Sequence, residues 1–217
     1  LICNNFDRDK IMEKIGLDRN KKTIMYAPTW GWGAGNNNFF CRWFDQEIKA
    51  LEKLCKTAAD ENLNFIIRLH SLSFRANNKA LIDITKKYNV KWQTTETSNF
   101  QDDPNEYLWI TDILISDLSG IISEFMVLDR PIIYIDPDEN NEPWKDSDMP
   151  KDFRAGHIVK DLEQLSEVIK DCILYPSRHS EKRKNFISKI YSNVDGKAIE
   201  RATSCILKFV ESKGIKL

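Results

Sequence analysis

The stretch that decides the fold is Asp112–Glu124, which reads DILISDLSGIISE. It opens with a short, continuous apolar run of the kind that forms a strand buried on both faces. Small polar residues follow the run, and a helix is predicted directly after them, over 119–128. A strand that passes through a short polar loop into a helix is the repeating unit of α/β proteins.

Similar units recur along the chain. Helices are predicted between the strands and after them, at Phe44–Asn62, Ala76–Lys87, Leu162–Tyr175 and Asp195–Glu211. Further strands are predicted at Thr23–Ala27, Asn64–Leu69, Val90–Gln93, Pro131–Ile135 and His157–Val159. Alternating strands and helices indicate a Rossmann-like, doubly wound parallel sheet with helices on both faces.

The composition limits the possible functions. The chain has 217 residues, 41% of them hydrophobic, and its 32 basic and 33 acidic side chains give a net charge of -1. We therefore expect no nucleic-acid partner. The five cysteines are scattered and form no CxxC pair, which favours idle thiols in a reducing cytoplasm over disulfides or a metal site. We expect no cofactor, and no apolar run reaches the roughly 20 residues that span a bilayer.

We expect one nucleotide-binding α/β domain over 1–217. Because the chain opens at Leu1 rather than at Met, we expect it to be part of a longer protein. Residues 1–20 would then lead in from a preceding N-terminal domain, and 177–217 would form C-terminal helices.

The loop after the strand at 112–115 is the strongest candidate for a ligand site. In doubly wound sheets, ligands bind beyond the carboxyl ends of the strands. Ser116, Asp117, Ser119 and Gly120 lie there, and they indicate a phosphate site at the start of a helix. Glu124 follows about one turn later, where its carboxylate suits ribose hydroxyls. Ser119 as an ordinary helix N-cap is the alternative.

Two other strand ends carry polar residues. Thr29 precedes a glycine-rich stretch over 31–35, which either covers a ligand or is a plain surface loop. His70 follows a strand, so it either meets a phosphate or transfers a proton, or it is structural. Arg68 is either buried and paired or directed at an anion.

Two C-terminal features have competing interpretations. The basic run Arg178–Lys184 is either a solvated helix face or a contact for a membrane surface or an acidic acceptor. His157 either touches the substrate or is structural.

Five segments in order resemble the CDP-glycerol glycerophosphotransferases, whose members carry segments such as ILYAPTW, a KxHP strand end and an SDYSS signature. These segments are IMYAPTW (Ile24–Trp30), IIRLH (Ile66–His70), DILISDLSGIISEFMVLDRPIIYIDPD (Asp112–Asp138), DFRAGHIV (Asp152–Val159) and NVDGKAIERA (Asn193–Ala202).

The resemblance implies the C-terminal domain of a GT-B-type enzyme with two Rossmann-like domains. It implies transfer of a polyol phosphate from a CDP-linked donor to a hydroxyl of a lipid-linked or polymer acceptor. The product would be a teichoic-acid-like polymer, made by a peripheral protein at the cytoplasmic face of the cell membrane. His70 matches the family's histidine at the donor pyrophosphate and is the expected catalytic residue. The residues that match the family's other site positions are Thr29, Ser116, Asp117, Ser119 and Glu124.

The sequence departs from the family at several positions. Ser71 and His157 stand where relatives have proline, Leu118 replaces a tyrosine, and Gly120 replaces a serine. The family's HGxxxK motif, whose histidine is the presumed base, does not occur in this chain. We therefore expect the base to come from the protein's own N-terminal domain, and this chain alone to be inactive.

Two other functions fit the same pattern. One is a sugar-nucleotide enzyme of GT-B architecture, either a glycosyltransferase or a protein like the UDP-sugar 2-epimerases. The other is a nucleotide-binding module without catalytic activity.

Overall fold

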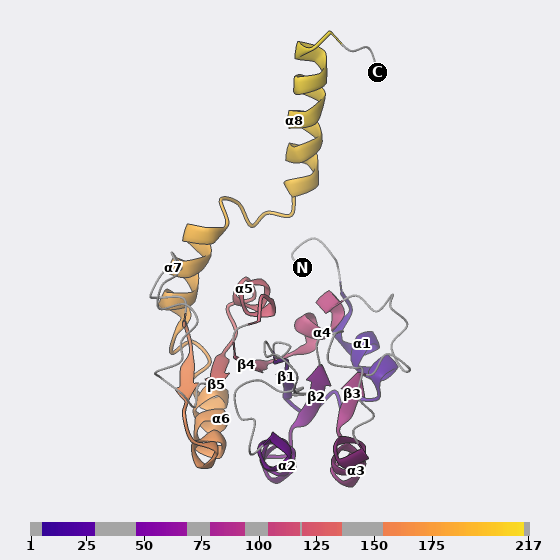
Figure 1. Ribbon diagram of the computed structural model, residues 1–217, viewed down its shortest axis with the longest axis vertical. Helices are drawn as coiled ribbons and strands as arrows, with labels where there is room; N and C mark the ends of the chain where they lie inside the picture. Colours follow the sequence, from indigo (N-terminus) through magenta and orange to yellow (C-terminus); the bar gives the residue numbers. More distant parts are fainter. Residues whose placement is uncertain are drawn as a thin grey trace, which may run out of the picture.

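The protein is a parallel α/β sheet with helices on both faces, followed by two C-terminal helices (Figure 1). The computed structural model describes residues 6–28, 47–68, 79–93, 104–117, 119–135 and 154–214. The strands are β1 (Thr23–Tyr26), β2 (Asn64–Arg68), β3 (Lys91–Gln93), β4 (Ile113–Ser116), β5 (Ile132–Ile135) and β6 (His157–Val159). The helices are α1 (Arg8–Ile15), α2 (Glu47–Asp60), α3 (Lys79–Lys87), α4 (Pro104–Ile110), α5 (Ile121–Met126), the 3-10 helix η3 (Leu162–Gln164), α6 (Leu165–Leu174), α7 (Ser180–Ile190) and α8 (Ala198–Ser212).

All six strands pair in parallel, in the order β3-β2-β1-β4-β5-β6. This is the strand order of the Rossmann fold, so the predicted fold class is confirmed. After β1 the chain builds β2 and β3 on one side, and it then returns to place β4 on the other side. The direction of strand addition therefore reverses between β1 and β4.

Alternate strand residues point into two separate cores. Ile24 and Ile115 pack with α2, α3 and α6 on one face of the sheet. Met25 and Leu114 pack with α1, α4, α5 and α7 on the other face. Figure 1 shows the same two layers of helices, with α2, α3 and α6 below the sheet. Because both faces are covered, the strands read as continuous apolar runs.

Two helices were not predicted from the sequence. Helix α1 begins after Asp7, whose side chain accepts a hydrogen bond from the Lys10 backbone N–H, and it buries Ile11 and Met12 in the second core. Helix α4 begins at Pro104 and is only seven residues long. The segment at 1–20, expected to lead in from another domain, thus contributes a helix to this core.

The C-terminal stretch leaves the α/β body. Helix α7 packs on the second core through Phe186, whereas α8 extends away from the body (Figure 1). Ile199 of α8 is 81% exposed and Phe209 is 62% exposed. Among the helices in the described ranges, none is long and apolar enough to cross a membrane.

Two cysteines lie in the first core. Cys55 and Cys172 are free and buried, and burial raises the pKa of both thiols to about 12. Such thiols are protonated and unreactive at neutral pH, as the scattered cysteine pattern predicted.

Candidate functional site

The carboxyl ends of β1 and β4 meet at the point where strand order reverses. Tyr26 pairs with Ile115, and the Ala27 backbone N–H donates to the Ile115 carbonyl at 2.9 Å. The Ser116 hydroxyl donates to the Ala27 carbonyl at 2.6 Å. These bonds fix the two strand ends side by side, which is where doubly wound sheets bind nucleotides.

Ser116 and Asp117 are buried at the carboxyl end of β4. Ser116 is 0% exposed and Asp117 is also buried. The Ser116 hydroxyl already donates its hydrogen bond to the Ala27 carbonyl. This contact favours a structural role for Ser116, in which it fixes the loop, over a contact with a phosphate. The predicted phosphate contact of either residue is not tested by the structure.

Ser119 and Gly120 lead into α5. Gly120 is the residue before the helix, and no side chain caps this helix end. The Ser119 carbonyl accepts a hydrogen bond from the Ile122 N–H, and the Gly120 carbonyl accepts one from the Ser123 N–H. Since the N-cap of α5 is Gly120, the alternative that Ser119 is the N-cap is wrong. Helix α5 has only six residues, so its dipole adds little, and the candidate site rests on the place of the loop in the sheet.

Gly120 leaves open space at the site. Its backbone is helical, with φ of -56°, so glycine is not required for its conformation. A Cβ built at this position meets no atom of the described residues within 4 Å. Within the described residues neither the backbone conformation nor packing requires glycine here, which is consistent with a ligand that approaches the backbone closely.

Glu124 and Arg68 flank the loop on neighbouring elements. Glu124 is exposed on the first turn of α5, where its carboxylate is accessible to a ligand. Arg68 ends β2 and is half-buried, with its guanidinium carbon 5.3 Å from the centroid of the Tyr107 ring. Because β2 adjoins β1, the ends of β2, β1 and β4 form one continuous edge.

Three positions of interest lie outside the described residues. These are the site residues Thr29 and His70, and Leu118, where the sequence departs from the family. Their roles stay predictions. Within the described part of the chain, no group of three His, Cys, Asp or Glu side chains is arranged to hold a metal ion.

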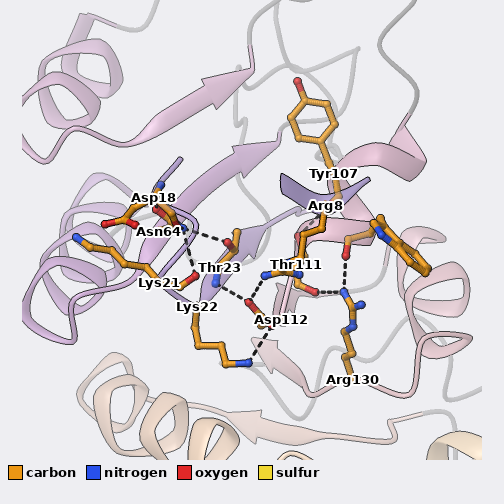
Figure 2. A network of polar contacts seen from close by, with 11 residues as sticks. Arg8, Asp18, Lys21, Lys22, Thr23, Asn64, Tyr107, Thr111, Asp112 and Arg130 are labelled. Carbon is orange, nitrogen blue, oxygen red and sulfur yellow. Dashed lines mark hydrogen bonds and ion pairs between the residues drawn. The ribbon is translucent and has the colours of Figure 1, made fainter. Parts of the chain in front are cut away.

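The opposite edge of the sheet carries a polar network that the sequence did not reveal (Figure 2). Asp112 accepts hydrogen bonds from the Thr23 N–H at 2.8 Å and from Arg8 at 2.7 Å, and its other oxygen lies 3.3 Å from Lys22 Nζ. Arg130 donates to the carbonyls of Trp109 and Thr111, each at 2.6 Å. Both Asp112 and Arg130 belong to the segment that resembles the family signature, and their role is to join strand starts to α1 and α4.

The basic run Arg178–Lys184 contains three cations that form ion pairs, and one of them is buried. Arg183 is 1% exposed, and its Nε donates to the Asp129 carboxylate at 2.9 Å. Lys184 lies 3.4 Å from the same carboxylate. Arg178 donates to Asp171 at 2.6 Å. The interpretation as a solvated face holds for Arg178, Lys182 and Lys184, which are exposed, and is wrong for Arg183, which is buried and joins α7 to Asp129.

His157 lies at the start of β6, on the side of the sheet away from the strand ends. Its Nε2 is 2.9 Å from an oxygen of Asp171, and its ring meets that of His179 edge-on at 4.8 Å. Gly156, just before it, is tightly packed, since a Cβ there would collide with the Ile132 carbonyl. These contacts favour the structural interpretation of His157.

The strand order β3-β2-β1-β4-β5-β6 defines a Rossmann-like α/β domain. The family described as CDP-Glycerol:Poly(glycerophosphate) glycerophosphotransferase matches residues 2–208, so the chain belongs to that family.

Individual relatives agree with this assignment. The chain is 27% identical over 196 residues to the teichoic acid ribitol-phosphate polymerase TarL of Staphylococcus aureus, covering 89% of this chain and 32% of that protein. It is 31% identical over 169 residues to a teichoic acid poly(glycerol phosphate) polymerase of Bacillus spizizenii, covering 74% of this chain and 38% of that protein. The chain thus spans about a third of the length of these relatives.

Solved structures share the fold. The wall teichoic acid polymerase TagF matches with a TM-score of 0.67 at 22% identity, over 95% of this chain and 48% of that one. The UDP-GlcNAc 2-epimerase of Neisseria meningitidis matches with a TM-score of 0.54 at 17% identity, over 93% of this chain and 48% of that one. At these identities the likeness establishes the fold and leaves the ligand open.

Proposed function

We propose that this chain is the C-terminal, CDP-donor-binding domain of an enzyme that transfers polyol phosphate to an acceptor hydroxyl in teichoic-acid-like polymer synthesis. The observation that carries the proposal is the joined end of β1 and β4, with the loop over 116–120 at the reversal of strand order. Membership of the family supplies the chemistry. TagF structures soaked with CDPG indicate that a relative of the same fold takes such a donor.

In this proposal the acceptor oxygen attacks the phosphorus that carries the polyol. The new P–O bond forms as the bond between that phosphorus and the bridging oxygen of CMP breaks, and CMP leaves with the electron pair. Charge builds up on the leaving phosphate, so cationic and N–H donors beside it favour the transition state. Arg68, His70 and the loop at Ser119–Gly120 would supply those donors.

The acceptor proton needs a base, and we assign that base to the protein's own N-terminal domain, as the missing HGxxxK motif implies. Closure of the two domains would then assemble the site. The chain by itself should bind donor and fail to turn it over. Release of CMP from CDP-glycerol by this chain alone, in the presence of an acceptor, would contradict this division of roles.

Calorimetric titration tests the binding proposal. We expect saturable binding of CDP-glycerol and CMP to the isolated chain. A competing proposal, a sugar-nucleotide enzyme, is supported by the fold shared with a UDP-GlcNAc 2-epimerase. Binding of UDP-N-acetylglucosamine in preference to CDP-glycerol would favour that competitor and overturn our proposal. Binding of nucleotide without turnover in the full-length protein would favour the non-catalytic module.

We also propose that the full enzyme works peripherally at the inner face of the cell membrane, where a lipid-linked acceptor lies. The exposed apolar residues Ile199, Ile206 and Phe209 of α8 support this, since interfacial helices bury such side chains in lipid. Cosedimentation with vesicles containing anionic lipid is the test. Absence of binding to them would contradict membrane contact through this chain.

A further inference from the structure

We propose that Tyr107 is a positioning residue that holds the Arg68 guanidinium in place for the donor diphosphate. The inference rests on the proposed function, because it takes Arg68 to contact the donor. Neither the sequence motifs nor the positions of the strand ends pointed to Tyr107.

Arg68 and Tyr107 lie on the same face of the sheet. Along β2, Phe65 and Ile67 point into the first core and Ile66 points into the second. By alternation Arg68 follows Ile66, toward the layer that contains α4 and α5. The guanidinium carbon lies 5.3 Å from the centroid of the Tyr107 ring, within the range of a cation–π contact.

Tyr107 is a rigid support. Its side chain is 8% exposed and belongs to the second core. The Thr111 hydroxyl donates to the Tyr107 carbonyl at 2.7 Å, and Arg130 donates to the Thr111 carbonyl. In Figure 2 the Tyr107 ring extends away from this network. The backbone of Tyr107 is thus tied to Thr111, while its ring contacts Arg68.

The geometry of an arginine suits this arrangement. A guanidinium that lies against an aromatic ring directs its N–H groups outward in its own plane, a geometry that matches phosphate oxygens. An arginine side chain loses considerable rotamer freedom when it binds a ligand. A ring that restricts the guanidinium beforehand reduces that loss, and affinity for the ligand rises.

The test is a double-mutant cycle read by calorimetric titration with CDP-glycerol. We expect Tyr107→Phe, which keeps the ring, to bind as the wild type does. Tyr107→Leu should weaken binding about fivefold, in line with the loss of a cation–π contact. In an Arg68→Ala background, Tyr107→Leu should have no further effect, because the group that it positions is gone. A merely structural role would weaken binding equally in both backgrounds.

Three results would overturn the inference. Wild-type affinity in Tyr107→Leu would show that the ring does not position Arg68. An equal loss with and without Arg68 would show general damage to the fold. Unchanged affinity in Arg68→Lys, which keeps the charge and loses the planar fork, would show that stacking is irrelevant, and this variant serves if Tyr107→Leu does not fold. If the wild type itself does not bind CDP-glycerol, the proposed function fails, and the inference fails with it.

Discussion

The Ser116 hydroxyl donates to the Ala27 carbonyl at 2.6 Å, so a buried side-chain hydrogen bond adds to the backbone pairing of β4 and β1 where strand order reverses. Ser116 is fully buried, and its replacement leaves a buried carbonyl without this donor. We predict that Ser116→Ala lowers the free energy of unfolding by about 1–2 kcal/mol. It should also weaken CDP-glycerol binding, because one of the bonds that hold the two strand ends beside the site is lost.

Thermal unfolding and titration of the same sample measure both effects. Ser188→Ala is the matched control, since the Ser188 hydroxyl also donates to a carbonyl, that of Asn185, on the exposed surface of α7. The control should change neither quantity appreciably. A Ser116→Ala protein with wild-type stability would mean that this bond does not hold the strands.

Gly120→Ala separates ligand contact from folding. The glycine has a helical backbone, and an added Cβ meets no atom in the part of the chain that the structure describes, so stability should change by less than about 0.5 kcal/mol. If a phosphate approaches this backbone closely, the methyl group should lower CDP-glycerol affinity about tenfold. Unchanged affinity in a normally folded variant would place the donor phosphates elsewhere.

Asp112 is predicted to matter for stability and not for donor binding. Asp112→Ala removes the acceptor for the Thr23 N–H and for Arg8, at a position only partly exposed. We expect a loss of about 2–4 kcal/mol of unfolding free energy, measured by urea denaturation. Nucleotide affinity of the folded fraction should remain near wild type, since Asp112 lies at the opposite edge of the sheet.

Asp195→Ala is the control for the Asp112→Ala substitution. Asp195 forms a bidentate ion pair with Arg201, but the pair is exposed on the surface. Its loss should leave the denaturation midpoint almost unchanged. An equal effect of the two substitutions would contradict the structural role of the Asp112 network.

His179 should make stability depend on pH. Burial, followed by the nearby His157, Lys182, Arg183 and Arg178, lowers the pKa of His179 to about 4. The folded state therefore binds a proton less readily than the unfolded state, whose histidine titrates near 6.5. Stability should be fully present above about pH 6.5 and should fall as the pH drops toward 4.

Unfolding midpoints across this pH range, in the wild type and in His179→Gln, test the prediction. The variant cannot titrate at this position, so its curve should be flatter between pH 6.5 and 4. His157 contributes in the same direction, because burial lowers its pKa despite the nearby Asp171 carboxylate. Parallel curves for wild type and variant would exclude His179 as a source of the pH dependence.

The strands were predictable because their chemistry is local. Runs such as Thr23–Ala27 and Pro131–Ile135 are apolar on both faces, and a doubly covered parallel sheet requires that pattern. Helix α4 was missed because its seven residues are too few for a clear helical period. Helix α1 was not predicted, because its stability depends on the Asp7 cap and on packing against a helix that is distant in the sequence.

The position of the candidate site in the sheet was predictable from the sequence, but the hydrogen-bond partners of its side chains were not. The strand-end rule pointed to 116–120 before any geometry was known. That Ser116 would bond to Ala27, 89 residues away, depends on which strands become neighbours. The burial of Arg183 depends likewise on Asp129, 54 residues away in a turn after α5. Long-range partners of this kind leave no local pattern in a single sequence.

The most direct test of the account is a map of backbone amide chemical shifts as CDP-glycerol is added to the isolated chain. We expect the largest chemical-shift changes at Ala27, Asp117, Ser119 and Gly120. The shifts of Thr23 and Asp112, on the opposite edge of the sheet, should change little. Largest changes at that opposite edge, or no saturable change at the four residues named, would contradict a donor site between β1 and β4.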